Sequence, residues 1–307
     1  MSTIERAAAR LAAIGKVRTE PELRDTALAK APSLETSNDL EPISRLDSGL
    51  PPFQSPIGGG YCELNLDALT AAGFATSHNA NVEIAADLRR IKRPLLMAIK
   101  KSAALGSRVL PPNLVLITSA VPGEGKTFVS INLALSIAAE LDKTVLLVDA
   151  DVAKNDVARV LGVSYETGLT DLLERENLHS EDAILRTNVE SLSLLPSGPR
   201  LPNVDELFAS DRMARLIRDL AEQDADRIVI VDAPPLHAGT EAGVLARMVG
   251  HVVVLVEADK TPQASVADAL HQLKGCESVS MVLNKARRRS SDHIAYGYGY
   301  GYGTQGS

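Results

Sequence analysis

A glycine-bearing turn holds the residues with the clearest chemical potential. In ITSAVPGEGKTFVSINLA, Lys126 and Thr127 follow PGEG, between an apolar run and a helix-period segment. Gly123 and Gly125 leave room for backbone N–H groups to curl around phosphate oxygens. A lysine adds a cation there, and a threonine hydroxyl is a ligand that Mg²⁺ accepts. The turn therefore predicts a loop that binds the phosphates of a nucleotide, although Ala120 stands where the general pattern has glycine.

The predicted loop contacts its ligand through consecutive residues. The helix expected to begin near Thr127 adds the partial positive charge of its N-terminus. The residues expected to bind the nucleotide are Pro122, Gly123, Glu124, Gly125, Lys126, Thr127 and Phe128. The alternative is a glycine-rich turn that happens to precede a lysine, and the flanking strand, helix and threonine disfavour it.

Three aspartates end two of the apolar runs. Asp232 ends IVIVD, whereas Asp149 and Asp151 end LLVDAD. Because the carboxyl ends of parallel strands meet at one edge of a sheet, we expect these carboxylates beside the phosphate loop. Thr127, Asp149 and Asp232 are the predicted Mg²⁺ ligands, and one of the Asp149/Asp151 pair remains to act as general base or to orient the acceptor. The predicted catalytic residues are Lys126, Asp149, Asp151 and Asp232, although each aspartate taken singly also suits a helix N-cap.

These residues need a sheet to position them. Short apolar runs without alternation, the pattern of strands covered on both faces, recur along the chain. They are NLVLITS (113–119), TVLLVDAD (144–151), RIVIVDAP (227–234), HVVVLVEA (251–258) and VSMVLNK (279–285). Helix-period segments such as FVSINLALSIAAEL lie between them. The alternation predicts an α/β fold with a doubly wound, mostly parallel sheet and a P-loop NTPase core.

Composition divides the chain into three parts. Residues 1–80 contain no strand-like run, and residues 31–60 are rich in proline, serine and glycine. We therefore expect a helix and a linker over 1–80, largely disordered. A catalytic domain is expected over 81–288, and a flexible tyrosine-rich tail over 289–307.

The overall composition excludes several classes of protein. Of the 307 residues, 45% are apolar and 23% are charged, and the net charge of −7 argues against a nucleic-acid partner. Cys62 and Cys276 share no ligand-like spacing with a histidine, which indicates free thiols instead of a disulfide or a metal site. No apolar run approaches the ~20 residues that span a bilayer, so we expect a cytoplasmic protein.

Four segments resemble motifs of the bacterial tyrosine kinases of polysaccharide synthesis. PGEGKT (122–127) is similar to their Walker A motif, LLVDAD (146–151) to their Walker A′ motif, and IVIVDAPP (228–235) to their Walker B motif. LPSGPRLPNVDELFASDRM (195–213) is similar to their GxxPPNPxELL stretch, with Val204 in place of a proline. The resemblance implies a partition-ATPase-like P-loop core, with ATP and Mg²⁺ as cofactors.

The same resemblance implies a protein-tyrosine autokinase that regulates exopolysaccharide polymerisation and export. Its phosphate acceptors would be Tyr296, Tyr298, Tyr300 and Tyr302, which alternate with glycines near the end of the sequence. Glycine spacers let any of these rings enter a cleft in an extended conformation. The reach of the tail leaves open whether transfer occurs within one chain or between chains.

Two further sites follow from the resemblance. Asn284 in VLNK (282–285) matches a segment that contacts adenine, and its amide offers both a donor and an acceptor. Asp87, Arg90 and Arg93 match the spacing of a subunit-interface motif, with aspartate in place of glutamate. They imply a homo-oligomeric ring, and a solvated charged helix face is the alternative.

The expected partners also come from the resemblance. It implies a membrane activator of the chain-length-determinant type, which would recruit the chain to the inner membrane, and a phosphotyrosine phosphatase is a further candidate partner. A partition or septum-placement ATPase is the competing function, but Val121 stands where its signature lysine belongs. A regulatory scaffold that binds ATP without transferring phosphate is the third.

Overall fold

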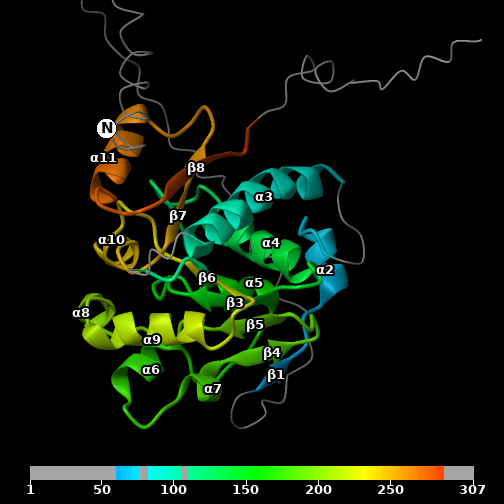
Figure 1. The fold of residues 1–307 in the computed structure, drawn as a ribbon, viewed down its shortest axis with the longest axis vertical. Helices are drawn as coiled ribbons and strands as arrows, with labels where there is room; N and C mark the ends of the chain where they lie inside the picture. The colour runs from blue at the N-terminus through cyan, green and yellow to red at the C-terminus, as the bar shows by residue number, and fades with distance from the viewer. Residues whose placement is uncertain (1–59, 77–81, 105–109, 287–307) are drawn as a thin grey trace, which may run out of the picture. The chain divides into compact units, whose positions relative to one another are not determined.

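The computed structural model describes residues 60–76, 82–104 and 110–286, and its centre is an eight-stranded sheet (Figure 1). The strand order is β1-β4-β5-β3-β6-β2-β7-β8, and neighbouring strands are parallel except for the β4–β5 pair. The strands are β1 Tyr61–Cys62, β2 Leu114–Ser119, β3 Thr144–Asp149, β4 Leu185–Thr187, β5 Leu192–Leu195, β6 Arg227–Asp232, β7 His251–Glu257 and β8 Val279–Asn284. The prediction of a doubly wound, mostly parallel α/β sheet is confirmed.

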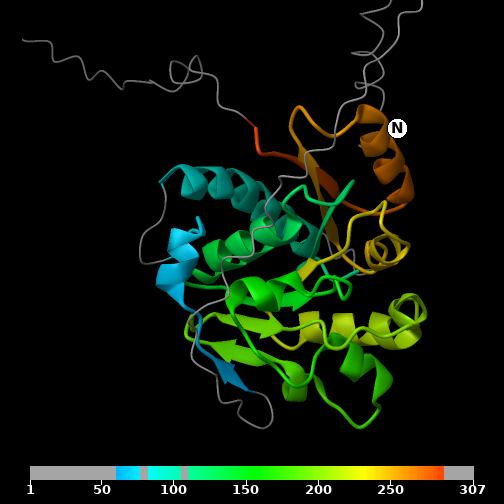
Figure 2. The ribbon, with the colours of Figure 1, turned by 180° about the vertical axis from the view of Figure 1, so that it is seen from behind.

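Helices cover both faces of the sheet, as the two opposite views show (Figures 1 and 2). One face packs against α2 Leu66–Ala71, α3 Val82–Ala104, α4 Lys126–Ala138 and α5 Asp156–Leu161. The other face packs against α6 Leu169–Glu174, α7 Ser180–Ala183, α8 Val204–Phe208, α9 Asp211–Glu222, α10 Glu241–Leu245 and α11 Gln263–Gln272. The sheet therefore separates two apolar cores.

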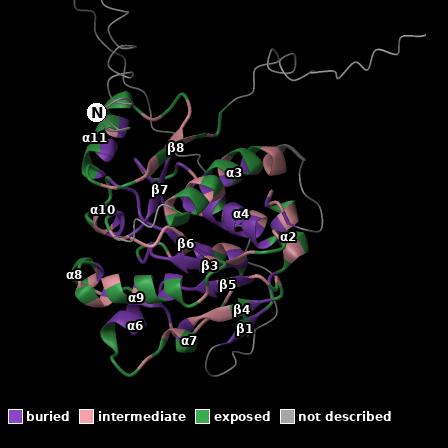
Figure 3. Ribbon diagram, viewed as in Figure 1, coloured by how far each residue is buried: buried purple, intermediate pink, exposed green. Residues whose placement is uncertain are grey.

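Strand β2 shows why the central strands lack polar alternation. Leu114 and Leu116 belong to the core on the α9 side, whereas Val115 and Ile117 belong to the core on the α4 side. Every residue of β2 is buried, and the central strands are buried in the same way (Figure 3). A strand with helices on both faces buries side chains on both sides, so its sequence is predominantly apolar.

The five apolar runs of the sequence all form strands, but β8 differs from the others. It lies at an edge of the sheet and pairs only with β7 among the described residues. Its Met281 and Leu283 side chains are 44% and 64% exposed, so a run expected to be covered on both faces is covered only in part.

The expected boundary at residue 81 is too late. Strand β1 pairs with β4, and the backbone of Leu64 exchanges two hydrogen bonds with the Asn188 side chain, at 2.9 and 3.0 Å. Leu64, Leu69 and Phe74 are buried in the core on the α4 side. Residues 60–76 therefore belong to the folded domain. These residues could not be recognised from the sequence because a two-residue strand has no detectable period.

Two expectations for the ends of the chain lie outside the described residues. They concern the N-terminal helix and linker up to residue 59 and the tyrosine-rich tail over 289–307. Within the described ranges, no helix combines the length and the hydropathy needed to cross a bilayer.

Candidate active site

The predicted phosphate loop connects the end of β2 to the start of α4. Gly123 and Gly125 have φ values of +88° and +93°, which glycine adopts far more readily than other residues. Gly125 caps α4, so Lys126 and Thr127 are the first two residues of that helix. Because the N-terminus of a helix carries a partial positive charge, the loop and helix together suit an anion.

The loop lysine makes a buried ion pair with the predicted second carboxylate of LLVDAD. Lys126 Nζ lies 3.1 Å from Asp151 Oδ2, and the two residues are 4% and 2% exposed. Asp151 follows the end of β3, the strand next to β6. The structure thus brings Lys126 and Asp151 together at one edge of the sheet, as the sequence predicted.

Asp232, the last residue of β6, is held by two hydroxyl groups from α4. Thr127 Oγ1 donates to one carboxylate oxygen at 2.7 Å, and Ser130 Oγ donates to the other at 2.9 Å. Burial raises the pKa of Asp232 to about 6, against the lowering effect of Lys126 and of the two donors. Two of the three predicted metal ligands, Thr127 and Asp232, are therefore neighbours.

Ser130 is a site residue that the sequence reading missed. It lies one helical turn after Thr127, so the two hydroxyls share the face of α4 that meets β6. The available signal in the sequence was a hydroxyl residue three positions after Thr127, on the same face of the predicted helix.

Asp149 has a different environment from Asp151. Its carboxylate accepts the backbone N–H of Asp151 at 3.0 Å and that of Val157 at 3.2 Å. Burial and, next, the neighbouring Asp232 hold the pKa of Asp149 well above its usual range. Its oxygens hold the loop between β3 and α5 and accept an N–H from the first turn of α5. This role resembles the helix N-cap that the sequence offered as the alternative. Its predicted roles as metal ligand and catalytic residue stay predictions.

The raised pKa of Asp232 predicts a pH-dependent Mg²⁺ site. A carboxylate must be ionised to bind a metal, so apparent Mg²⁺–nucleotide affinity should fall by up to about tenfold per pH unit as the pH drops through the pKa, which is about 6. Titration calorimetry with Mg²⁺ and ADP between about pH 5 and pH 8 measures this slope. An affinity that does not change over this range would contradict a Mg²⁺ ligand at Asp232 whose pKa is about 6.

Glu124 stabilises the loop through its side chain. It is fully buried, and its carboxylate accepts the backbone N–H of Val121 at 2.8 Å and of Glu257 at 3.0 Å, as well as the Thr261 hydroxyl. The predicted contact of Glu124 with a nucleotide must therefore use its backbone. Thr261, which the sequence reading also missed, lies in the segment that follows β7.

The remaining loop neighbours lie at or near the surface. Asn284 Nδ2 donates to the backbone oxygen of Glu124 at 2.7 Å, which leaves the Asn284 carbonyl as an acceptor for a base. Pro122 is exposed, and Phe128 is 37% exposed with its ring centroid 4.8 Å from that of Phe74. These positions are compatible with the predicted nucleotide contacts, which stay predictions.

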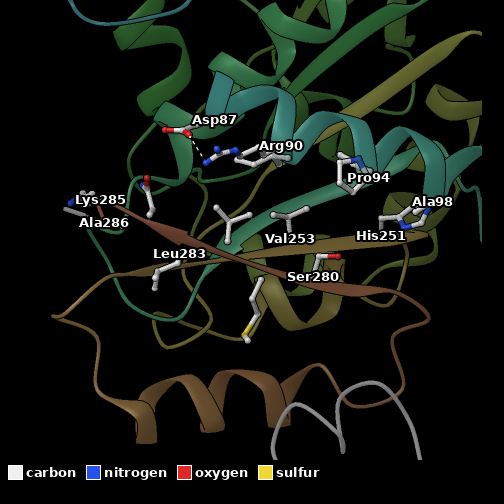
Figure 4. A pocket seen from close by; sticks show the side chains of 15 residues that line it. Asp87, Arg90, Pro94, Ala98, His251, Val253, Ser280, Leu283, Lys285 and Ala286 are labelled. Atoms are coloured by element: carbon white, nitrogen blue, oxygen red, sulfur yellow. Dashed lines mark hydrogen bonds and ion pairs between the residues drawn. The ribbon is translucent and has the colours of Figure 1, made fainter. Parts of the chain in front are cut away.

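The predicted interface residues lie on the exposed face of α3. Asp87 Oδ1 and Arg90 Nη1 are 3.4 Å apart, and Arg93 is exposed on the same helix. Asp87 and Arg90 line one end of a groove of about 820 Å³ between α3 and the β7–β8 edge, and the buried His251 lines its other end (Figure 4). The structure thus shows these charges at the surface, and their subunit contacts stay a prediction.

A strand–loop–helix phosphate site with aspartates at the ends of two adjacent parallel strands defines a P-loop nucleoside triphosphatase fold. A family profile described as "AAA domain" matches residues 113–283, a range that contains β2 and all of β8 except its last residue.

Relatives narrow this class. The tyrosine-protein kinase YwqD of Bacillus subtilis is 35% identical over 183 residues, which are 60% of this chain and 76% of the relative. The tyrosine-protein kinase Wzc of Salmonella typhimurium is 31% identical over 187 residues, which are 60% of this chain and 26% of the relative. The kinase domain of the Escherichia coli tyrosine kinase ETK superposes with a TM-score of 0.53 at 33% identity, and the match covers 62% of this chain and 73% of that one. The chain belongs to the bacterial tyrosine-protein kinases.

Proposed function

We propose that the chain is an ATP-dependent tyrosine kinase that phosphorylates its own C-terminal tyrosines and thereby regulates exopolysaccharide polymerisation and export. The proposed acceptors are Tyr296, Tyr298, Tyr300 and Tyr302. The observation that carries the proposal is the group formed by the buried Lys126, Asp151 and Asp232 and the half-buried Thr127 around the phosphate loop, in a chain that belongs to this kinase family.

The residues present suit Mg²⁺. Mg²⁺ prefers oxygen ligands and is commonly bound by one or two carboxylates together with substrate phosphates. The Thr127 hydroxyl and the Asp232 carboxylate, 2.7 Å apart, supply that set at the start of α4. When bound, the ion would neutralise negative charge on the β- and γ-phosphates. Thr127 and Asp232 would hold it, and Asp149 is the candidate third ligand.

The protein residues divide the remaining work. The loop N–H groups and Lys126 bind and orient the phosphates, so the γ-phosphorus faces the acceptor. The tyrosine oxygen forms a bond to that phosphorus while the bond to the β–γ bridging oxygen breaks and ADP leaves. The phenolic proton passes to a carboxylate. Asp149 and Asp151 are the two candidates. The oxygens of Asp149 already accept two backbone hydrogen bonds, and Asp151 becomes available when Lys126 turns from it to the phosphates.

The position of the last described residues supports the tail as the substrate. Lys285 Nζ donates to the backbone oxygen of Gly123, so the chain leaves β8 beside the phosphate loop. Tyr296 is the tenth residue after Ala286, and an extended chain of that length reaches roughly 35 Å. Such a reach allows transfer within one chain or to a neighbouring subunit. We propose transfer between chains, in a ring formed through Asp87, Arg90 and Arg93, because these residues match the spacing of a subunit-interface motif.

The proposed partners complete the cycle. A membrane protein of the chain-length-determinant type would activate the kinase and recruit it to the inner membrane, and a phosphotyrosine phosphatase would reset the tail. The charged face of α3 is exposed and therefore accessible to a second subunit.

Peptide mass mapping after incubation with Mg²⁺ and ATP tests the proposal. We expect phosphate on Tyr296–Tyr302 in the wild-type chain and none in a variant with the four tyrosines replaced by phenylalanine. In a mixture, the phenylalanine variant should phosphorylate the tail of a Lys126→Met chain, because its own active site is intact. Transfer confined to one chain would leave that tail unmodified.

The competing functions predict different results. A scaffold would bind ATP and never produce phosphotyrosine, even with the cytoplasmic segment of the membrane activator present. A partition-type ATPase would hydrolyse ATP under the same conditions while the tail stayed unmodified. Either result would overturn the kinase proposal.

A further inference from the structure

Two consecutive residues at the end of β8 hold the phosphate loop by its carbonyl groups. Asn284 Nδ2 donates to the backbone oxygen of Glu124 at 2.7 Å. Lys285 Nζ donates to the backbone oxygen of Gly123, also at 2.7 Å, and lies 3.0 Å from Glu257 Oε2. The ends of β7 and β8 are thus joined to two successive peptide groups of the loop.

Peptide geometry gives these contacts a direction. In a trans peptide, the C=O and the N–H of one group point to opposite sides. The Gly123 carbonyl shares its peptide with the Glu124 N–H, and the Glu124 carbonyl shares its peptide with the Gly125 N–H. Holding both carbonyls on the β8 side therefore turns both N–H groups to the opposite side of the loop. Successive N–H groups of this kind form the anion-binding surface of a phosphate loop.

The backbone conformation of Lys285 indicates that its contacts hold it in one defined position. Its φ is +56°, a left-handed conformation that costs a residue with a side chain roughly 1–2 kcal/mol. Such strain persists where surrounding contacts over-determine the conformation. The contacts here are the Gly123 oxygen and the Glu257 carboxylate, whose pKa the Lys285 hydrogen bond and then Lys260 keep below its usual value.

We propose that Lys285 is a positioning residue of the nucleotide site, which acts by holding the Gly123 carbonyl so that the Glu124 N–H faces the phosphates. The proposal rests on the proposed function, because it assumes that the loop binds a nucleotide. Lys285 acts through the loop and need not touch the nucleotide itself.

The alternative is an ordinary surface ion pair with Glu257. Exposed pairs contribute little, and the Lys285 side chain is 46% exposed. The structure provides a matched comparison, because Lys260 pairs with the same carboxylate at 3.3 Å. Among the described residues, Lys285 also donates to the loop, whereas Lys260 makes no hydrogen bond to it. Removing each lysine in turn therefore separates the loop contact from the ion pair.

The test measures binding of ADP with Mg²⁺ to the full chain by titration calorimetry, for the wild type, Lys285→Met, Lys285→Arg and Lys260→Met. A hydrogen bond from a charged group suggests that Lys285→Met weakens ADP binding about tenfold. Lys260→Met should stay within about twofold of the wild type, because a surface ion pair contributes little. Lys285→Arg should recover most of the affinity, since its guanidinium can still reach the carbonyl. In the kinase assay, Lys285→Met should raise the KM for ATP and leave kcat nearly unchanged.

Three results would overturn the proposal. The first is equal ADP affinity in Lys285→Met and the wild type. The second is an equal loss in Lys285→Met and Lys260→Met, which would assign the effect to the ion pair. The third is a fall in the unfolding temperature of nucleotide-free Lys285→Met that accounts for the lost binding and that arginine does not reverse. A wild-type chain that fails to bind ADP would instead refute the proposed function.

Discussion

The Lys126→Met chain should form no phosphotyrosine when it is incubated with Mg²⁺ and ATP, a loss of at least about 10²-fold in rate. Lys126 is the first residue of α4, and its buried ammonium group lies at the edge of the sheet where the loop, β3 and β6 meet. Methionine keeps much of the volume of the side chain but removes the charge that stabilises the transferred phosphoryl group. Phosphotyrosine mass mapping against time measures the rate.

The buried partner of Lys126 requires a stability control. Breaking a buried ion pair by removing one member costs about 3–5 kcal/mol, because the other charge remains without compensation. Lys126→Met should therefore lower the unfolding temperature, and adding Asp151→Asn should restore most of it. The double variant should be folded and still inactive. Lys143→Met provides the second control, since Lys143 pairs with Asp226 at the opposite end of β3 and its loss should leave phosphorylation unchanged. Substantial phosphorylation in folded Lys126→Met would refute its assigned role.

The Gly125→Ala chain should lose nucleotide binding more severely than the Gly123→Ala chain. Both glycines have φ near +90°, so alanine strains the backbone at either position by roughly 1–2 kcal/mol. At Gly125 a Cβ would also lie 2.5 Å from Asn284 Nδ2, whereas at Gly123 it would have no atom within 4 Å. The overlap would push Asn284 away from the Glu124 carbonyl that it holds.

Titration with ADP and Mg²⁺ measures this difference. If the empty alanine loop relaxes and must return to a φ near +90° to bind the phosphates, backbone strain predicts up to about a 30-fold loss for Gly123→Ala, and the added overlap predicts a larger loss for Gly125→Ala. Gly162→Ala is the control, because this glycine also has a positive φ with no neighbour within 4 Å, but it caps the C-terminus of α5. Its ADP affinity should equal that of the wild type. Equal losses at positions 123 and 125 would show that the Asn284 contact does not affect binding.

Local patterns in the sequence predicted the parts of the fold and site that depend on neighbours along the chain. The phosphate loop is contiguous, so PGEGKT indicated both its positive-φ glycines and the helix that follows. The central apolar runs indicated parallel strands because both of their faces are buried. Because the ends of parallel strands lie at one edge of the sheet, the sequence predicted that Asp232 and Asp151 lie beside the loop. In the structure Asp232 bonds to Thr127 and Asp151 to Lys126.

Contacts between segments that are distant along the chain could not be predicted from local sequence patterns. Glu124 bonds to Glu257 and Lys285 bonds to Gly123 across 133 and 162 residues, and no local pattern announces either pairing. The short strands β1, β4 and β5 were missed because two to four residues give no reliable period. The different environments of Asp149 and Asp151 depend on the path of the loop after β3, which the sequence does not reveal.

The attachment of the loop to the end of β8 also makes nucleotide affinity a property of how the chain leaves the sheet. Lys285, which bonds to the loop, is followed directly by the segment of the chain that leads to the tyrosines. A ligand, subunit or modification that moves Lys285 favours one conformation of the phosphate loop over another. By thermodynamic linkage it then changes the affinity for the nucleotide by some factor. The nucleotide must then change the free energy of that displacement by the same factor. A modification of the tail that displaced Lys285 would therefore be coupled to occupancy of the nucleotide site.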